Sequence, residues 1–515
     1  MDQDTRQSEL PKVPEKTAEA SSASESGSSP GYSSWFGGRR TKVGPRIAPV
    51  QDHLDAGSDS DQSAEAILAK QHASEDGHAI KYRTCSWQKT AGLLFSEYIC
   101  LHSRPCSRVP LDLDLVPAET GADSLHSLIL TAVIALIVLY TSLILWQFCL
   151  RHPEVRDVCD IGQMLFWGKK WAWYATAVMF ILNNTALHVL VGAKYLNTMT
   201  ATDPVTCRTV VFSIVVTIIC WLCSLPRTFD ALSKAGTASA AFTFISVLLA
   251  TIFAGIQAHP AGYDPRPSYV DESGVSHVGG IPIVTAVPLA STTFVAGMNA
   301  FLNISYTFIG QITLPSFIAE MKNPRDFPKA LWAVTIGEII VFSIVGAVIY
   351  AYTGNQYMTA PAFGSLEELY KKVSFSFMIP TLVFLGVLYA SVSCRFLFFR
   401  IFRNNPKHIQ ENTLIGWGSW ATILLLSLMS SLFDSFFGFI FWGVAYFRMR
   451  SADNTHGIPR SNKILDWASM GLNIIIILTG VLFLTVGTYA SVEGIIEEFE
   501  AGTVGRVFTC ASNGI

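Results

Sequence analysis

The sequence predicts an all-α membrane protein that crosses the bilayer many times, and two observations carry this prediction. Of the 515 residues, 50% are apolar and only 15% are charged, whereas soluble domains carry about 25% charged residues. Beyond residue 90, the chain contains repeated apolar runs of more than about 18 residues, which is the length that a membrane helix needs. A soluble globular enzyme is therefore excluded for this part, and a net charge of −3 gives no indication of a nucleic-acid partner.

Charge is concentrated at the N-terminus. The first 80 residues hold 21 charged side chains, and the other 435 hold 54. The first segment is rich in Ser, Glu, Asp, Ala and Gly, and it has too few large apolar residues to offset the entropy of ordering. We predict a disordered, cytosolic tail over residues 1–83 and a transmembrane domain over residues 84–515.

Eight runs are long enough to cross the bilayer core as helices. Strands of a membrane barrel would alternate polar and apolar residues in short segments, and these runs do not. The predicted spans are 128–148, 171–193, 209–226, 235–258, 292–319, 330–353, 373–394 and 467–492.

Basic residues alternate between successive loops. One set of five loops, which starts with the loop from Arg151 to Lys170, contains 17 Lys and Arg residues. The alternate four segments, which include 194–208 and 259–291, contain six. Because cytosolic loops collect Lys and Arg, the first set is predicted to lie inside and the second outside.

Two stretches do not fit this alternation. Residues 415–447 are flanked by basic residues on both sides, and 33 residues are too few for two full spans, which predicts a re-entrant hairpin or a shortened helix. A cytosolic tail also requires a crossing before residue 128, but only the 11 residues 91–101 are apolar there. A tail on the outside would satisfy the alternation equally.

A motif in the run 292–319 resembles the central signature of a known family. The segment reads SYTFIGQ at 305–311 and continues with PSFIAEMKNP at 315–324. These residues resemble the amino acid/auxin permease family, and within it the fungal neutral amino acid permeases. Weaker similarities are SLPRT at 224–228 and FLFFRIF at 396–402, and the resemblance extends over about residues 82–515.

This resemblance implies eleven helices that form an inverted five-plus-five repeat plus an eleventh helix. In such folds the first and sixth helices are unwound near the middle of the membrane, where substrate binds. Against the family pattern, the first helix is damaged at 102–127 and the ninth appears joined to the tenth within 415–447. We hypothesise splice or reading-frame errors in the translated sequence, with a divergent protein as the alternative.

The sixth family span is dense in amides and hydroxyls and carries no charge. The resemblance implies a broken segment from Asn303 to Gly310 whose backbone N–H groups face the substrate carboxylate. The alternative is that these groups only form hydrogen bonds between helices. The predicted substrate-binding residues are Asn303, Ser305, Tyr306, Thr307 and Gly310 on this span, with His188 and Ser391 on the spans 171–193 and 373–394.

Glu97 and Glu338 are carboxyl groups inside apolar runs. Burial of a charged carboxylate is costly unless the group is paired or neutralised, and such groups suit proton coupling. Alternatively, Glu338 reaches a cytosolic base, and Glu97 lies in a segment that does not span. Cys207 and Cys510 both fall on the predicted outer side and are a candidate disulfide.

The sequence therefore predicts a secondary active transporter of neutral amino acids, coupled to protons and working by alternating access. Its expected partners are the amino acid, the proton and the lipid bilayer, in the plasma membrane rather than the vacuole. We expect no catalysis, cofactor, metal or nucleic acid, because the chain has no P-loop and His188 is the one histidine inside a clear span. The alternative is a non-transporting nutrient sensor or an inactive paralogue with the same fold.

Overall fold

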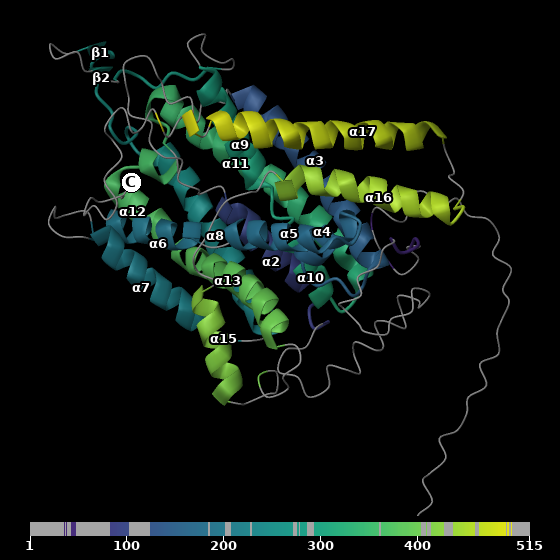
Figure 1. Ribbon diagram of the computed structural model, residues 1–515. Helices are drawn as coiled ribbons and strands as arrows, with labels where there is room; N and C mark the ends of the chain where they lie inside the picture. The colour runs from purple at the N-terminus through teal and green to yellow at the C-terminus, as the bar shows by residue number, and fades with distance from the viewer. Residues whose placement is uncertain are drawn as a thin grey trace, which may run out of the picture.

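The structure is a computed structural model of the chain, and nearly all of its described residues are helical (Figure 1). Its one small sheet within the described residues is an antiparallel pair, β1 (Tyr269–Val270) and β2 (Ser276–His277). The described residues are 36, 38, 43–47, 83–101, 124–183, 186–200, 208–226, 229–270, 276–277, 279–285, 293–359, 362–402, 408, 414–426, 436–458, 463–490, 492–493 and 496.

The first part of the chain supplies seven described α-helices. In chain order they are α2 (Trp87–Leu101), α3 (Ser124–Arg151), α4 (Val158–Leu165), α5 (Lys170–Asn183), α6 (Ala186–Met199), α7 (Arg208–Cys223) and α8 (Phe229–Ile256). The short α4 lies between α3 and α5 and begins where the Asp157 side chain accepts hydrogen bonds from the backbone N–H groups of Cys159 and Asp160.

The second part supplies eight described α-helices and four short 3₁₀ or π segments. The α-helices are α9 (Phe294–Thr307), α10 (Leu314–Glu320), α11 (Phe327–Tyr357), α12 (Glu368–Ser376), α13 (Ile379–Phe402), α15 (Leu414–Leu426), α16 (Phe441–Thr455) and α17 (Lys463–Leu482). The 3₁₀ segments are η1 (Pro324–Asp326) and η2 (Ala362–Ser365), and the π segments are η3 (Phe436–Ile440) and η4 (Phe483–Gly487).

The predicted all-α, polytopic class is confirmed. Within the described residues, five helices are long and apolar enough to cross a membrane, and each overlies one of the predicted spans. They are Leu128–Arg151, Leu232–Ile256, Pro324–Tyr357, Ile379–Phe398 and Lys463–Ala490. A helix satisfies its own backbone polar groups, which lipid cannot do.

Helix α2 lies inside the bundle and packs against α8, α11, α13 and α9. Small residues allow close approach to α8, since a Cβ added at Gly236 would lie 2.8 Å from the end of the Leu93 side chain. The hydroxyl groups of Ser96 on α2 and Ser239 on α8 are 2.6 Å apart and both are buried. The short apolar segment 91–101 thus belongs to a helix inside the bundle, whose described part has 15 residues.

The stretch 415–447 contains parts of two separate helices. Helix α15 packs against α13 and α7, whereas η3 and α16 pack against α3 and α17, and Figure 1 shows α15 and α16 well apart. The second helix continues beyond the expected limit at 447 to Thr455. Residues 427–435, which include the expected junction, lie outside the described residues.

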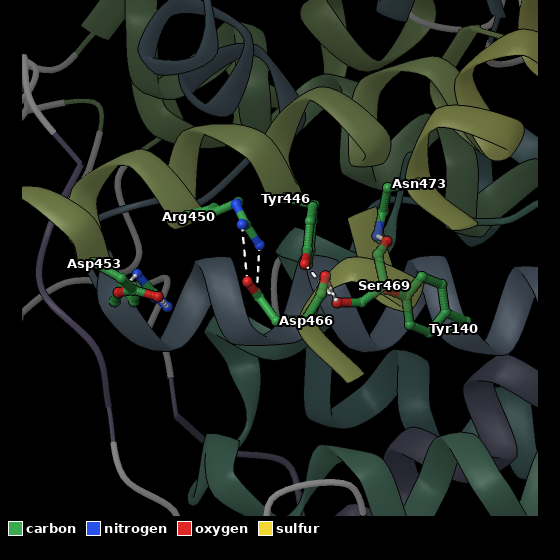
Figure 2. A network of polar contacts seen from close by, with 8 residues as sticks. Tyr140, Tyr446, Arg450, Asp453, Asp466, Ser469 and Asn473 are labelled. Atoms are coloured by element: carbon green, nitrogen blue, oxygen red, sulfur yellow. Dashed lines mark hydrogen bonds and ion pairs between the residues drawn. The ribbon is translucent and has the colours of Figure 1, made fainter. Parts of the chain in front are cut away.

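Helices α3, α16 and α17 are joined by a series of polar contacts (Figure 2). Arg450 on α16 forms an ion pair with Asp466 on α17. Tyr446 lies one turn before Arg450 on α16, and its hydroxyl is 2.7 Å from that of Ser469 on α17. The Asn473 amide of α17 donates a 2.7 Å hydrogen bond to the Tyr140 hydroxyl on α3.

Candidate functional site

The sixth family span is interrupted in the structure. Helix α9 ends at Thr307, and α10 begins at Leu314, with Pro315 in its first turn. The six residues from Phe308 to Thr313 are buried and not helical. The break thus begins after Thr307, so Asn303 to Thr307, which were expected inside it, are still helical. Proline in the first turn favours a new helix start after the break.

Glu97 of α2 lies against this break. One oxygen of its carboxyl group, Oε1, accepts hydrogen bonds from the Thr313 hydroxyl at 2.8 Å and from the Tyr389 hydroxyl of α13 at 2.9 Å. The Glu97 side chain is fully buried, and its Oε2 has no hydrogen-bond partner among the described residues. One carboxyl group thus connects α2, the break and α13.

Glu338 of α11 is the second carboxyl group of this region. Its side chain is 2% exposed, and its Oε1 has no hydrogen-bond partner within the described part of the chain. Helix α11 packs against α2, and Gly337 lies beside Phe95. The helix packed against α2 therefore carries a second buried carboxyl group.

The other side of the break contacts α3. The Gln311 amide donates a 3.1 Å hydrogen bond to the Thr141 hydroxyl, and both side chains are buried. The carbonyl oxygen of Gly310 lies 2.9 Å from the Thr313 hydroxyl, so this hydroxyl has two acceptors, Glu97 and Gly310, for its single hydrogen. Rearrangement of either partner can therefore redirect that hydrogen.

The structure places several of the sequence-predicted site residues. Ser305 and Thr307 are buried in the last turn of α9, where the Ser305 hydroxyl donates to the Phe301 carbonyl of its own helix. Gly310 is buried within the break. Ser391 is buried on α13, but at 3.6 residues per turn it lies on another face from Tyr389, whereas Ser393 shares the Tyr389 face.

Other sequence-predicted residues are only partly described or lie outside the description. Asn303 and Tyr306 are part of α9 and His188 is part of α6, but the structure describes none of their side chains. Cys207 and Cys510 lie outside the described residues. Within the described part, no group of three or more His, Cys, Asp or Glu side chains could hold a metal ion.

Sequence reasoning missed Thr313, Tyr389 and Thr141 as residues of this region, and it noted Gln311 among the polar residues of the span without assigning it to the site. Each is a polar residue within an apolar span, which is the signal that could have selected them. Thr313 in particular lies between the two segments of the family signature.

An ion pair links the end of α10 to α13. Glu320 at the end of α10 pairs with Arg395 of α13, and both side chains are buried. Next to it the chain that leads into α2 pairs with the end of α10, since Cys85 N–H donates to the Glu320 carbonyl and Lys322 N–H donates to the Cys85 carbonyl, at 2.9 and 2.8 Å. The inner ends of α2, α10 and α13 are therefore joined.

Comparisons with known proteins identify the family of this chain. The family model described as transmembrane amino acid transporter protein matches residues 124–493. The N amino acid transport system protein of Neurospora crassa is 28% identical over 470 residues, which cover 86% of this chain and 92% of the relative. A transmembrane transporter of Gibberella moniliformis is 28% identical over 91% of this chain and 95% of its own length, and one of Fusarium pseudograminearum is 27% identical over 85% and 90%. With a match over most of its length, this chain belongs to the transmembrane amino acid transporter family.

Proposed function

We propose that this family member is a proton-coupled transporter of neutral amino acids, and that Glu97 carries the coupling proton. The observation behind this proposal is the position of Glu97, fully buried and bonded to both Thr313 in the break and Tyr389 on α13. A buried carboxyl group that connects a helix break to a neighbouring helix can couple its protonation to their relative movement.

The substrate is proposed to bind at the break between α9 and α10. Buried backbone that is not helical supplies polar groups without charge, and such groups suit the carboxylate and amino ends of a neutral amino acid. Asn303, Ser305, Tyr306, Thr307 and Gly310 are the proposed binding residues from this element, with His188 and Ser391 from α6 and α13. Movement of α2, α9 and α10 against α13 would then open the site to each side in turn.

Domain organisation, membrane and disulfide belong to the same proposal. Residues 1–83 form a cytosolic tail, residues 84–515 form the transport domain, and the protein functions in the plasma membrane. Cys207 and Cys510 form a disulfide on the outer side. A fluorescent fusion of the full chain would locate the membrane, and non-reducing peptide mapping would detect the disulfide.

Transport by purified chain in proteoliposomes tests the function. We expect an alkaline interior to drive accumulation of labelled alanine or leucine, but not of glutamate. Glu97→Gln should abolish accumulation driven by the gradient, while exchange of internal for external amino acid continues, because exchange needs no net proton movement. The matched control is Glu368→Gln, which changes an exposed carboxylate beside Lys371 and Lys372 on α12.

Three outcomes would contradict parts of this proposal. Gradient-driven uptake by Glu97→Gln at the rate of the control would remove Glu97 as the proton carrier. Accumulation of lysine in preference to leucine would mean that Glu97 and Glu338 act as counter-charges for a cationic substrate. A wild-type chain that is stabilised against heat by amino acids, yet transports none, would be a sensor.

A further inference from the structure

A short piece of the N-terminal tail, residues 43–47, is docked on the inner end of α3. Ile47 is 1% exposed, and its backbone N–H donates a 3.0 Å hydrogen bond to Nε2 of the buried His152. His152 directly follows α3, and its ring lies 5.0 Å from the ring of Phe148, centre to centre. The tail thus forms a specific contact with the membrane domain.

Charged groups surround this contact. Arg46 forms an ion pair with Glu154, and the same Glu154 oxygen lies 3.1 Å from Nδ1 of His152. Arg151 reaches the Pro45 carbonyl at 3.4 Å and binds both carboxylate oxygens of Asp453 on α16, at 2.7 and 3.1 Å. Residues 43–47 are therefore bound to groups that themselves connect α3 to α16.

The fit of the segment is close at Gly44. A Cβ added there would lie 2.6 Å from the guanidinium carbon of Arg151, so only glycine fits without displacing the arginine. A second piece of the tail contacts the α10 to α11 connection, where Gly38 N–H donates to the Arg325 carbonyl at 2.8 Å and Phe36 stacks on Trp332 at 5.5 Å. The tail therefore contacts the inner ends of α3 and α11.

The hydrogen bonds fix the protonation state of His152. Because a backbone N–H can only donate, Nε2 must be the unprotonated nitrogen of the ring, and the proton on Nδ1 is then donated to Glu154. A proton added at Nε2 would point at the Ile47 N–H and remove the bond. The docked arrangement therefore requires a neutral imidazole.

We propose that residues 43–47 form a pH-sensitive latch, which is docked while His152 is neutral and is released when a proton binds its Nε2. The latch ties the tail to the inner ends of α3 and α16, and acidification of the cytosol undocks it. This inference concerns the tail and does not depend on the substrate or on Glu97.

Burial shifts the pKa of His152 in the direction that the latch requires. It lowers the pKa of His152 below the usual value of 6.5, more than the Glu154 carboxylate raises it. The docked state therefore binds fewer protons than the released state, so docking is strongest at neutral pH and weakens as the pH falls below about 6.5. The pKa of Glu154 is lowered as well, since the hydrogen bond to His152 and the charge of Arg46 outweigh its burial. The charged groups nearest to His152 are Glu154, Arg46 and Arg151. Farther away are Asp453 on α16, which binds Arg151, and Arg83, whose charge lies near Cys149 of α3.

Amide hydrogen exchange of the full chain in lipid nanodiscs tests the latch. Exchange of the Ile47 amide would be measured by mass spectrometry from pH 7.5 to pH 5, and a synthetic peptide of residues 43–48 would supply the intrinsic rate at each pH. For one linked proton, we expect protection to fall up to about tenfold per pH unit below about 6.5. His152→Gln keeps an acceptor near the Nε2 position that does not titrate, so its protection should not vary with pH. His259→Gln, on the outer loop, is the matched control and should keep the wild-type slope.

Each result decides the proposal. A wild-type slope that His152→Gln removes and His259→Gln retains supports the latch. A flat wild-type profile, or the same slope in His152→Gln, overturns it. If the Ile47 amide has no protection at pH 7.5 in His152→Gln, the imidazole ring is required for docking. In that case, a pH-dependent protection in the wild type together with loss of protection in His152→Ala supports the latch.

Discussion

The hydroxyl of Tyr389 is one of two donors that hold the Glu97 carboxyl, at 2.9 Å in a fully buried position. While Glu97 is deprotonated, this hydrogen bond is made to a charged group, and such a bond contributes about 1.5 to 3 kcal/mol, roughly ten- to a hundredfold in an equilibrium. We therefore expect Tyr389→Phe to reduce proton-driven uptake at least tenfold with little change in folded protein. Initial uptake rates in proteoliposomes would measure this effect.

The same change at Tyr195 is the control for this prediction. Its hydroxyl lies 3.4 Å from that of Ser376, which is a weak contact away from Glu97. Tyr195→Phe should transport normally. If both variants lost uptake equally, the effect would not be specific to the Glu97 contact.

At this scale the sequence predicted the carboxyl groups but not their partners. Glu97 and Glu338 could be selected because carboxyl groups are rare inside apolar runs. Thr313 and Tyr389 are 216 and 292 residues away from Glu97 along the chain. A single sequence does not reveal these contacts, because they form only when α2, the break and α13 pack together.

Close packing of α2 on α8 depends on small residues between them. A Cβ at Gly236 would lie 2.8 Å from Leu93 and 2.9 Å from Phe384, two buried side chains. We expect Gly236→Ala to destabilise the fold by about 1 to 3 kcal/mol, as overpacking does, and to lower the thermal unfolding midpoint in detergent.

Gly418 on α15 provides the matched control, because a Cβ there meets nothing within 4 Å. Since alanine favours helix by up to about 1 kcal/mol over glycine, Gly418→Ala should leave the midpoint unchanged or raise it. Equal midpoints for the two variants would show that the α2 to α8 contact is looser than the structure indicates.

Hydropathy located the helices well but their ends poorly. The prediction ends the run 415–447 just before Arg448, because basic residues are typical of loops. In the structure α16 continues to Thr455. Arg450 is paired with Asp466 and Arg448 lies 5.6 Å above the Trp167 ring, so both charges have partners beside a helix. The sequence also does not show that the break starts after Thr307, because residues with amide or hydroxyl side chains remain helical when neighbouring groups form hydrogen bonds with those side chains.

Several ion pairs between helices or within their connections lie at one end of the bundle. Arg151 with Asp453, Arg450 with Asp466, and Lys329 with Asp326 all lie at the end that the positive-inside rule assigns to the cytosol. The tail contacts of Phe36 and Gly38 lie at this end too, since they are made with Trp332 and Arg325. These contacts support a cytosolic tail over a tail on the outside.

The opposite end of α11 leads to the side that the positive-inside rule assigns to the outside. Helix α11 is continuous up to Gly354, whose backbone is not helical (φ 59°, ψ −172°), so at about 1.5 Å per residue the part from 327 to 353 is roughly 40 Å long, enough to cross the bilayer core. Near its far end the Tyr357 hydroxyl donates to the Gly280 carbonyl, and the loop before Gly280 carries Arg266. Lys329 and Arg266 therefore lie toward opposite ends of α11, and they are expected on opposite sides of the membrane.

Thiol labelling in intact cells tests this orientation. The side chains of Lys329 and Arg266 are 47% and 65% exposed, so a cysteine at either position is within reach of a reagent in solution. We expect a membrane-impermeant maleimide to label Arg266→Cys in intact cells and Lys329→Cys only after permeabilisation, with the unsubstituted chain as the background for native cysteines. The reverse pattern would turn the whole bundle over, place the docked tail outside, and expose the His152 latch to the pH of the medium instead of the cytosol.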